Sequence, residues 1–219
     1  MDLKKLSEPL PIESIDFRVQ SVNKGGYATI LAYKDARVDM NRLNEVCGVL
    51  GWQRRHTREN KNCIVSIWDE DNKQWVSKED TGSESNAEAQ KGLASDSFKR
   101  ACFNLGIGIE LYDYPILSIK LNQNEFKVEN GKAKPTWDFK LKEWVWSSQF
   151  TDGKLNYLSC KDNLGVVRFT FGKHVLPTLV KDSKEWNGAL AKKSAIDILK
   201  KYFTITEENE KIYCEFLEK

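Results

Sequence analysis

The feature of this sequence that most constrains its fold is an amphipathic helix with a sharp stop between residues 92 and 108. Four apolar residues recur there at the i, i+3, i+4 and i+7 spacing that places side chains on one helix face: Phe98, Ala101, Cys102 and Leu105. Two glycines, Gly106 and Gly108, follow where the periodic pattern ends. We therefore predict a helix that packs on a core by this face.

The same helix carries two adjacent cations, Lys99 and Arg100, which must point away from the apolar face. Fixed cations near a Gly-x-Gly turn can hold phosphate groups, although the helix dipole favours cations at this end without any ligand. A second interpretation is a surface ion pair between Asp96 and Arg100, whose i, i+4 spacing brings them together on a helix.

The composition is that of a globular protein with a sizeable core. The chain has 219 residues, 40% hydrophobic and 30% charged, which suits one large or two small domains. No apolar run approaches the roughly 18 residues of a membrane span. The N-terminus lacks the apolar segment of a secretory signal, so we expect a cytoplasmic protein without membrane contact.

The charge is nearly balanced along the chain. The net charge is +2, with 16 basic and 18 acidic side chains in residues 1–115 and 18 and 14 in residues 116–219. Any surface that binds nucleic acid must therefore be local.

Cysteine and histidine usage argues against disulfides and metal sites. The five cysteines are odd in number, widely spaced and without a Cys-x-x-Cys pair, which is typical of free thiols in a reducing compartment. The two histidines, His56 and His174, are far apart in sequence. We predict no metal site.

Carboxylates at residues 69–71, 79 and 80 leave one alternative open, a nuclease in which paired acids hold two metal ions. Residues 69–73 also suit a tight turn between two strands, which needs no ligand. Gly106 and Gly108 end a helix instead of starting one, and the sequence has no phosphate-binding loop or nucleophile elbow. We therefore predict no catalytic residues, no enzyme activity and no cofactor.

Hydrophobic periodicity and turn residues predict an α+β fold in the first half of the chain. The expected elements are strands at 15–22, 27–33, 52–58, 63–68 and 74–79, a helix after Asp35 that ends before Gly48, and a helix from Ser85 or Asn86 to about Asn104. The order β-β-α-β-β-β-α predicts an antiparallel sheet with helices on one face.

The pattern of expected secondary-structure elements changes after Pro115. Short strands are expected at 116–121 and 125–129, a linker at 130–135, strands at 144–150, 155–160 and 166–171, and a helix from about Gly188 to Phe203. We therefore expect a domain over residues 1–115, strands and a linker over 116–135, and a small α+β module of unknown role over 136–219.

Two groups of basic residues are candidates for a nucleic-acid interface. Arg54, Arg55 and Arg58 belong to a basic run. Strand alternation would place its basic residues on both sides of a strand, and the alternative interpretation is a solvated end of a hairpin. The second group comprises Arg18, Lys24, Arg37, Lys99 and Arg100. These cations line one groove if they converge in the fold, and they are independent surface charges if they do not.

Five segments, in this order and spacing, resemble the Rad fifty-two type of single-strand annealing protein, particularly its short phage versions. They are Ile15–Arg18, Lys24–Tyr27 followed by Tyr33, Asp35–Val46, Gly51–Trp52, and Ser95–Ala101 followed by Gly106. The resemblance covers about residues 12–113, and its most specific parts are Asn44–Trp52 and Asp96–Gly106. Residues from Ile116 onward show no such resemblance.

The resemblance implies a β-β-β-α core that assembles into rings or curved homo-oligomers and holds single-stranded DNA in an outer groove. It further implies phage-type recombination and double-strand-break repair by annealing complementary strands without ATP, in a bacterial host cytoplasm if the protein is phage encoded. Arg18 matches the DNA-contacting arginine of the first core strand, and Lys99 with Arg100 match the lysine–arginine pair of the groove. Lys24 and Arg37 lie near corresponding segments without matching a functional position.

Two questions stay open at this point. Arg54, Arg55 and Arg58 are a hypothesis for a second DNA site, because no residue-level match supports them. Two functions compete with annealing: a mediator module that recruits a single-strand-binding protein or a recombinase through residues 136–219, and the metal-dependent nuclease.

Overall fold

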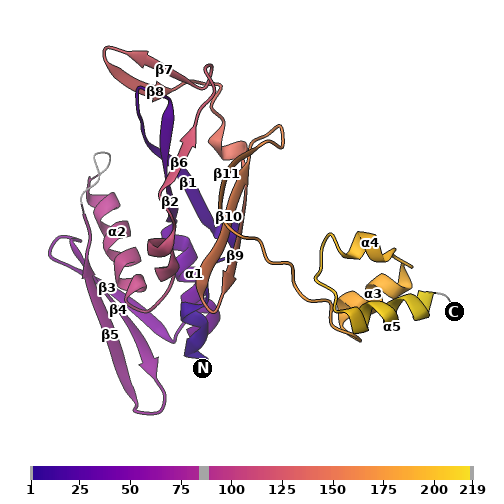
Figure 1. Cartoon of the computed structure of the whole chain (residues 1–219). Helices are drawn as coiled ribbons and strands as arrows, with labels where there is room; N and C mark the ends of the chain where they lie inside the picture. Colours follow the sequence, from indigo (N-terminus) through magenta and orange to yellow (C-terminus); the bar gives the residue numbers. More distant parts are fainter. Residues whose placement is uncertain (1, 84–88, 218–219) are drawn as a thin grey trace. The chain divides into compact units, whose positions relative to one another are not determined.

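The computed structural model describes residues 2–83 and 89–217, and it divides the chain into two compact units, Met1–Gly172 and Lys173–Lys219 (Figure 1). The division after Gly172 differs from the expected boundary at 116–135. The reason is that strands on both sides of that boundary pair with each other and share one core, as shown below.

The first unit contains eleven described strands, two α-helices and short 3-10 turns, which confirms the α+β class with antiparallel sheets. The strands are β1 (Ile15–Val22), β2 (Tyr27–Lys34), β3 (Trp52–Thr57), β4 (Asn62–Asp69), β5 (Gln74–Thr81), β6 (Leu117–Lys120), β7 (Phe126–Glu129), β8 (Lys132–Pro135), β9 (Val145–Thr151), β10 (Lys154–Lys161) and β11 (Val167–Gly172). The helices are α1 (Ala36–Cys47) and α2 (Ala89–Phe103), with 3-10 turns η1 (Leu3–Ser7), η2 (Ile12–Ser14), η3 (Ile109–Asp113) and η4 (Leu141–Glu143).

The strands are distributed over three sheets instead of one. The first has the order β6-β2-β1-β8-β7, the second β3-β4-β5 and the third β11-β10-β9. The β1–β2 hairpin forms as predicted, with Arg18 opposite Leu31 and Asp16 opposite Tyr33. Strand alternation therefore puts these four side chains on one face of the hairpin.

The segment expected to be a linker is a hairpin strand. Residues 130 and 131 form the β7–β8 turn with φ of +48° at Asn130 and +74° at Gly131, and β8 then pairs with β7 along its length and with β1 at Val22. An Asn-Gly pair favours such a two-residue turn because both positions tolerate positive φ. The β7–β8 hairpin thus extends the first sheet.

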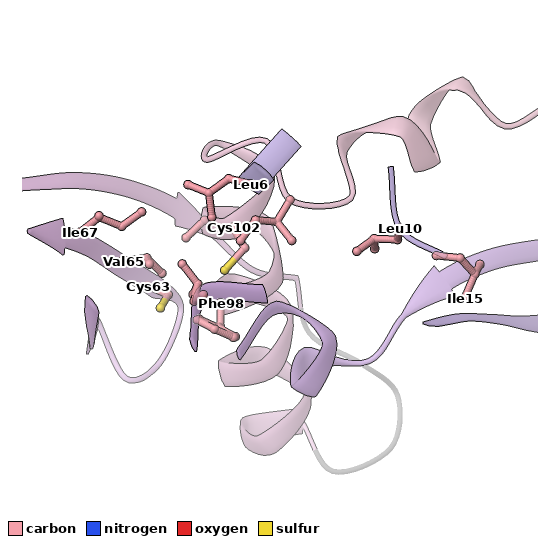
Figure 2. Close-up of a cluster of buried hydrophobic side chains, with 11 residues drawn as sticks. Leu6, Leu10, Ile15, Cys63, Val65, Ile67, Phe98 and Cys102 are labelled. Atoms are coloured by element: carbon pink, nitrogen blue, oxygen red, sulfur yellow. The ribbon is translucent and has the colours of Figure 1, made fainter. Parts of the chain in front are cut away.

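The second sheet packs on the two helices. The buried face of α2 contains Phe98, Ala101 and Cys102, as predicted, and these residues pack with Val65 and Ile67 of β4 in one cluster (Figure 2). Asp35 caps α1, its carboxylate accepting the Arg37 amide hydrogen at 2.8 Å. The expected start of α2 at Ser85 or Asn86 lies outside the described residues.

The third sheet shares a core with the first. Leu158 and Cys160 of β10 are buried together with Ile30, Leu117 and Ile119 of β2 and β6. This shared core explains why β9–β11 belong to the first unit and not to a separate module over residues 136–219.

The second unit is helical. It contains α3 (Lys184–Ala191), α4 (Ile196–Leu199) and α5 (Glu207–Leu217), with one isolated parallel bridge between Thr178 and Thr204. Its core includes Trp186 and Tyr213, whose ring centroids are 5.2 Å apart. The single helix expected over 188–203 is interrupted, because the backbone turns to a positive φ of 50° at Lys193. Within the described parts of both units, no helix combines the length and apolar character that a membrane span requires.

Candidate nucleic-acid interface

A cleft of about 880 Å³ lies between the β1–β2 hairpin and α2, with η3 contributing to its wall. We call it the α2 groove. Arg18 of β1 and Lys99 of α2 both line it. Two cations from different elements therefore line one cleft.

Arg18 and Lys99 are available for an external anion. Neither forms an ion pair with another described residue, and the Arg18 guanidinium lies 5.5 Å from the centroid of the Tyr33 ring. The nearest acid in the lining, Asp96, already accepts hydrogen bonds from the Ser83 amide at 2.8 Å and hydroxyl at 3.0 Å. The groove thus has two positive charges without a direct ion pair beside an engaged carboxylate, and the charge of Lys99 also acts at longer range on Asp35 and Asp39.

Aromatic side chains complete the groove. Tyr33, Phe103 and Tyr112 line it, and the rings of Phe103 and Tyr112 are 5.0 Å apart in an edge-to-face arrangement. The sequence analysis missed these residues. For Tyr33 a signal existed, since hairpin alternation places it on the face of Arg18; for Tyr112, in a 3-10 turn, no periodic signal was present.

Lys34, which lines the groove, belongs to a buried ion pair that the sequence analysis missed. Lys34 is 1% exposed and its ammonium contacts the Asp39 carboxylate and the Ile107 carbonyl oxygen. Burial lowers the pKa of Lys34, and burial raises the pKa of Asp39 to about 6 although Lys34 opposes this rise. Lys34 ties β2 to α1 and to the turn after α2, so its role is to position the groove walls.

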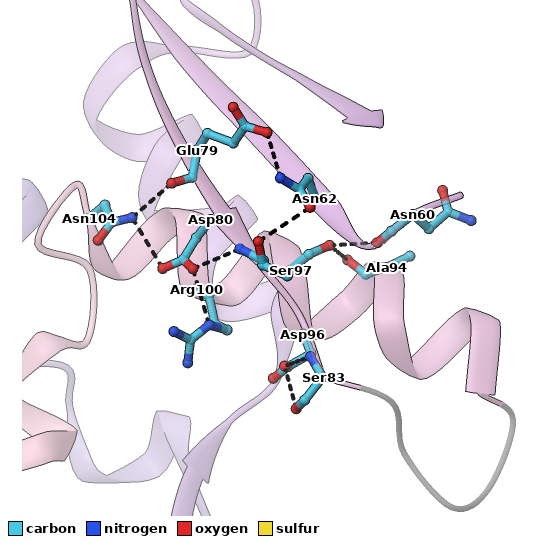
Figure 3. Close-up of polar contacts among 11 residues, drawn as sticks. Asn60, Asn62, Glu79, Asp80, Ser83, Ala94, Asp96, Ser97, Arg100 and Asn104 are labelled. Carbon is cyan, nitrogen blue, oxygen red and sulfur yellow. Dashed lines mark hydrogen bonds and ion pairs between the residues drawn. The ribbon is translucent and has the colours of Figure 1, made fainter. Parts of the chain in front are cut away.

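Arg100 follows Lys99 in sequence but is engaged elsewhere. Its Nε is 3.3 Å from Oδ1 of Asp80 on β5, while Asn104 donates to the other carboxylate oxygen at 3.2 Å (Figure 3). It does not appear among the residues that line the α2 groove. The expected Asp96–Arg100 pair is therefore wrong, because a carboxylate from β5 takes the guanidinium and Ser83 takes Asp96.

Lys24 and Arg37 lie outside the groove lining. Lys24 is exposed in the β1–β2 turn. Arg37 is 82% exposed and pairs with Asp35 at 2.8 Å, and hydrogen bonding to Asp35 raises the pKa of Arg37. These two cations do not converge with Arg18 and Lys99.

The basic run of β3 is split by the fold. Arg54 covers the Phe98 ring at 4.7 Å, and His56 lies 3.5 Å from the Ser97 hydroxyl, so both face α2. Burial, followed by the charge of Arg54, lowers the pKa of His56. Arg55 is exposed on β3, and Arg58 begins the β3–β4 turn with a φ of 50°. The run therefore does not form one continuous rim.

The candidate metal ligands have structural partners. Asp69 accepts hydrogen bonds from the amides of Asp71 and Asn72, as expected for a turn. Glu79 accepts from the Asn62 side chain at 2.7 Å. Within residues 2–83 and 89–217, no three His, Cys, Asp or Glu side chains are grouped to hold a metal ion. All five cysteines are free, and burial raises the pKa of Cys63 to about 11 and of Cys160 to about 12.

Comparison with known proteins finds a similarity to a single-stranded DNA-binding protein. No protein-family model matches the chain. The chain is 28% identical over 153 residues to the single-stranded DNA-binding protein DdrA of Deinococcus deserti, and the match covers 65% of this chain and 68% of that protein.

Proposed function

We propose that this protein binds single-stranded DNA in the α2 groove and acts in DNA repair. The observation that carries the proposal is the meeting of Arg18 and Lys99 in one cleft, without an ion pair to any described residue. The similarity to a single-stranded DNA-binding protein supports the same ligand.

The chemistry of the groove suits a single strand. Lysine and arginine side chains that neutralise phosphates release counterions, which yields sequence-independent and salt-sensitive affinity. Aromatic rings such as Tyr33 and Tyr112 stack on any base, because every base has a π face. Neither a nucleotide cofactor nor a metal ion is needed for this binding.

We further propose that the bound strand is annealed to its complement without ATP, as the Rad fifty-two resemblance implies. In this proposal the protein holds the DNA strand by its phosphate backbone, and base pairing between the two strands supplies the specificity. Homo-oligomers, in a ring or a curved filament, would extend the groove from one copy to the next. Light scattering with and without DNA tests that part of the proposal.

The DNA-binding proposal is tested by fluorescence anisotropy with labelled oligothymidine at several salt concentrations. Each phosphate contact on a single strand contributes about −0.7 to the slope of log K against log salt. The Arg18→Ala/Lys99→Ala variant should therefore bind at least about tenfold more weakly, with a slope flatter by about 1.4. Lys24→Ala/Arg55→Ala removes two exposed cations outside the groove and serves as the matched control.

Two results would contradict the proposal. One is unchanged affinity in a folded Arg18→Ala/Lys99→Ala variant. The other is an equal loss in the control variant, which would indicate diffuse charge attraction instead of a groove. Annealing is measured separately with two complementary oligonucleotides and no ATP, and a protein that binds but does not accelerate pairing would favour the mediator function.

A further inference from the structure

A second cleft, of about 940 Å³, also has Arg18 in its lining. Its lining combines β1 with the end of the β7–β8 hairpin and with residues 136–143, which belong to the segment that the mediator hypothesis assigned to partner proteins. We call it the Trp137 cleft. It lies entirely within the first unit.

Trp137 is the most unusual side chain of this cleft, because 88% of its surface is exposed. The segment that carries it is nevertheless anchored on both sides. The Thr136 amide donates to the Glu125 carbonyl oxygen at 2.9 Å, and Phe139 and Leu141 are buried in the core shared by the first and third sheets. An indole held open to solvent by an anchored backbone is a preformed stacking surface.

Positive charge surrounds the indole. The Lys140 ammonium lies 5.3 Å from the centroid of the Trp137 ring, and the high exposure of the ring leaves stacking surface free. The cations that line the cleft are Arg18, Lys127, Lys134, Lys140 and Lys142, against the acids Asp138 and Glu143.

Two of these cations share one carboxylate, which leaves the group of three side chains with a net charge of +1. Glu129 pairs with Lys127 at 2.7 Å and with Lys134 at 2.5 Å, and hydrogen bonds from these lysines lower the pKa of Glu129 to about 2. Lys140 and Lys142 have no ion pair with any residue that the structure describes. An exposed indole beside uncommitted lysines is the pattern that recognises a nucleobase and its phosphates.

Arg18 connects this cleft to the α2 groove, because its side chain lines both. We propose that the Trp137 cleft is a second subsite for the same single strand, in which Trp137 stacks on a base while Lys140 and Lys142 contact the phosphates. This proposal rests on single-strand binding in the α2 groove and extends the strand path past Arg18.

The test compares oligothymidines of two lengths on the full chain, one of about 6 nucleotides and one of about 20, which bracket the usual site sizes of single-strand binders. Trp137→Ala should weaken binding of the longer strand by about tenfold, as loss of one stacked base predicts, and Trp137→Phe should retain most of the affinity. Lys140→Ala/Lys142→Ala should flatten the salt slope for the longer strand by about 1.4. Tyr202→Ala, which removes a 63% exposed ring from the second unit, is the matched control.

The outcomes separate this inference from the proposed function. If the unmodified chain binds neither length, single-strand binding itself fails and this proposal fails with it. If it binds both lengths and the Trp137 and lysine variants change neither, the second subsite is overturned while the α2 groove stands. A Trp137→Ala variant that changes the mass in light scattering without changing DNA affinity would instead make this surface a contact between copies of the chain, which also overturns the subsite.

Discussion

Arg168 of β11 is the side chain whose removal should destabilise the first unit most specifically. Its guanidinium donates to both carboxylate oxygens of Glu125, at 3.0 and 2.7 Å, and to the Lys120 carbonyl oxygen at 3.1 Å. It also lies 4.7 Å from the Trp144 ring centroid, and both charged groups are at least nine-tenths buried. Arg168 therefore fastens β11 to β6 and to the loop before β7.

The expected magnitude follows from the charge that would remain. Burial alone would raise the pKa of Glu125, but hydrogen bonds from Arg168 and the Asn122 amide hold this pKa below its ordinary value. Arg168→Met fills the space with apolar atoms and leaves the Glu125 carboxylate buried without its cation. Breaking a buried pair in this way costs about 3–5 kcal/mol. For a unit of this size the melting temperature should fall by about 6–20 °C.

The assay is urea and thermal unfolding followed by tryptophan fluorescence. Arg55→Met, an equivalent change at an exposed position of β3, should alter the free energy of unfolding by less than about 0.5 kcal/mol. Adding Glu125→Gln to Arg168→Met should recover part of the loss, since the amide oxygen still accepts from Asn122. The recovery is only partial because Asp162, which Arg168 also contacts at 3.2 Å, stays charged and buried without its cation. The coupling between the two sites should be about 1–3 kcal/mol. An Arg168→Met variant as stable as Arg55→Met, or strictly additive effects of the two changes, would refute this reasoning.

Three further predictions concern pH, binding and backbone strain. The pKa of Asp39 is about 6 in the folded protein, and its reference value is 3.8. At a pH between these two values, the folded state therefore binds one more proton than the unfolded state. The free energy of unfolding of the unmodified chain, measured against Asp39→Asn, should therefore rise by up to about 3 kcal/mol as the pH falls from about 7 to 4; a flat difference would contradict this. Asp80→Ala releases Arg100 and should strengthen single-strand binding, with a slope of log K against log salt that is steeper by about 0.7. A flatter or unchanged slope in fluorescence anisotropy would indicate that the bound DNA strand does not pass near Arg100. Gly26→Ala should cost about 1–3 kcal/mol in urea unfolding, since φ is +76° and a Cβ would lie 2.6 Å from the ring of the phenylalanine in β7. Gly131→Ala, with φ of +74° and open space around the Cβ, should cost less, and equal costs would exclude the ring contact as the cause.

Local patterns predicted most elements of the first half of the chain. The β1–β2 hairpin, the Asp35 cap of α1 and the buried face of α2 depend on periodicity and on side-chain hydrogen bonds within a few residues. The strand predicted at 125–129 matches β7, but the sequence predicted a linker in place of β8 although Asn130 and Gly131 carry a turn signal, because β8 has four residues and a lysine-rich, weakly alternating sequence. The chain division was misplaced because the pairing of β1 with β8 and of β2 with β6 is not local.

By itself, the sequence determined that Lys99 and Arg100 face away from the apolar side of their helix, since helix periodicity depends only on neighbouring residues. It also determined that Lys99 and Arg100 share a helix. Only the tertiary structure decided that Lys99 meets Arg18 in the α2 groove while Arg100 turns to Asp80 of β5. The physical reason is that adjacent helix residues point about 100° apart, and distant segments supply the partner that each side chain finds.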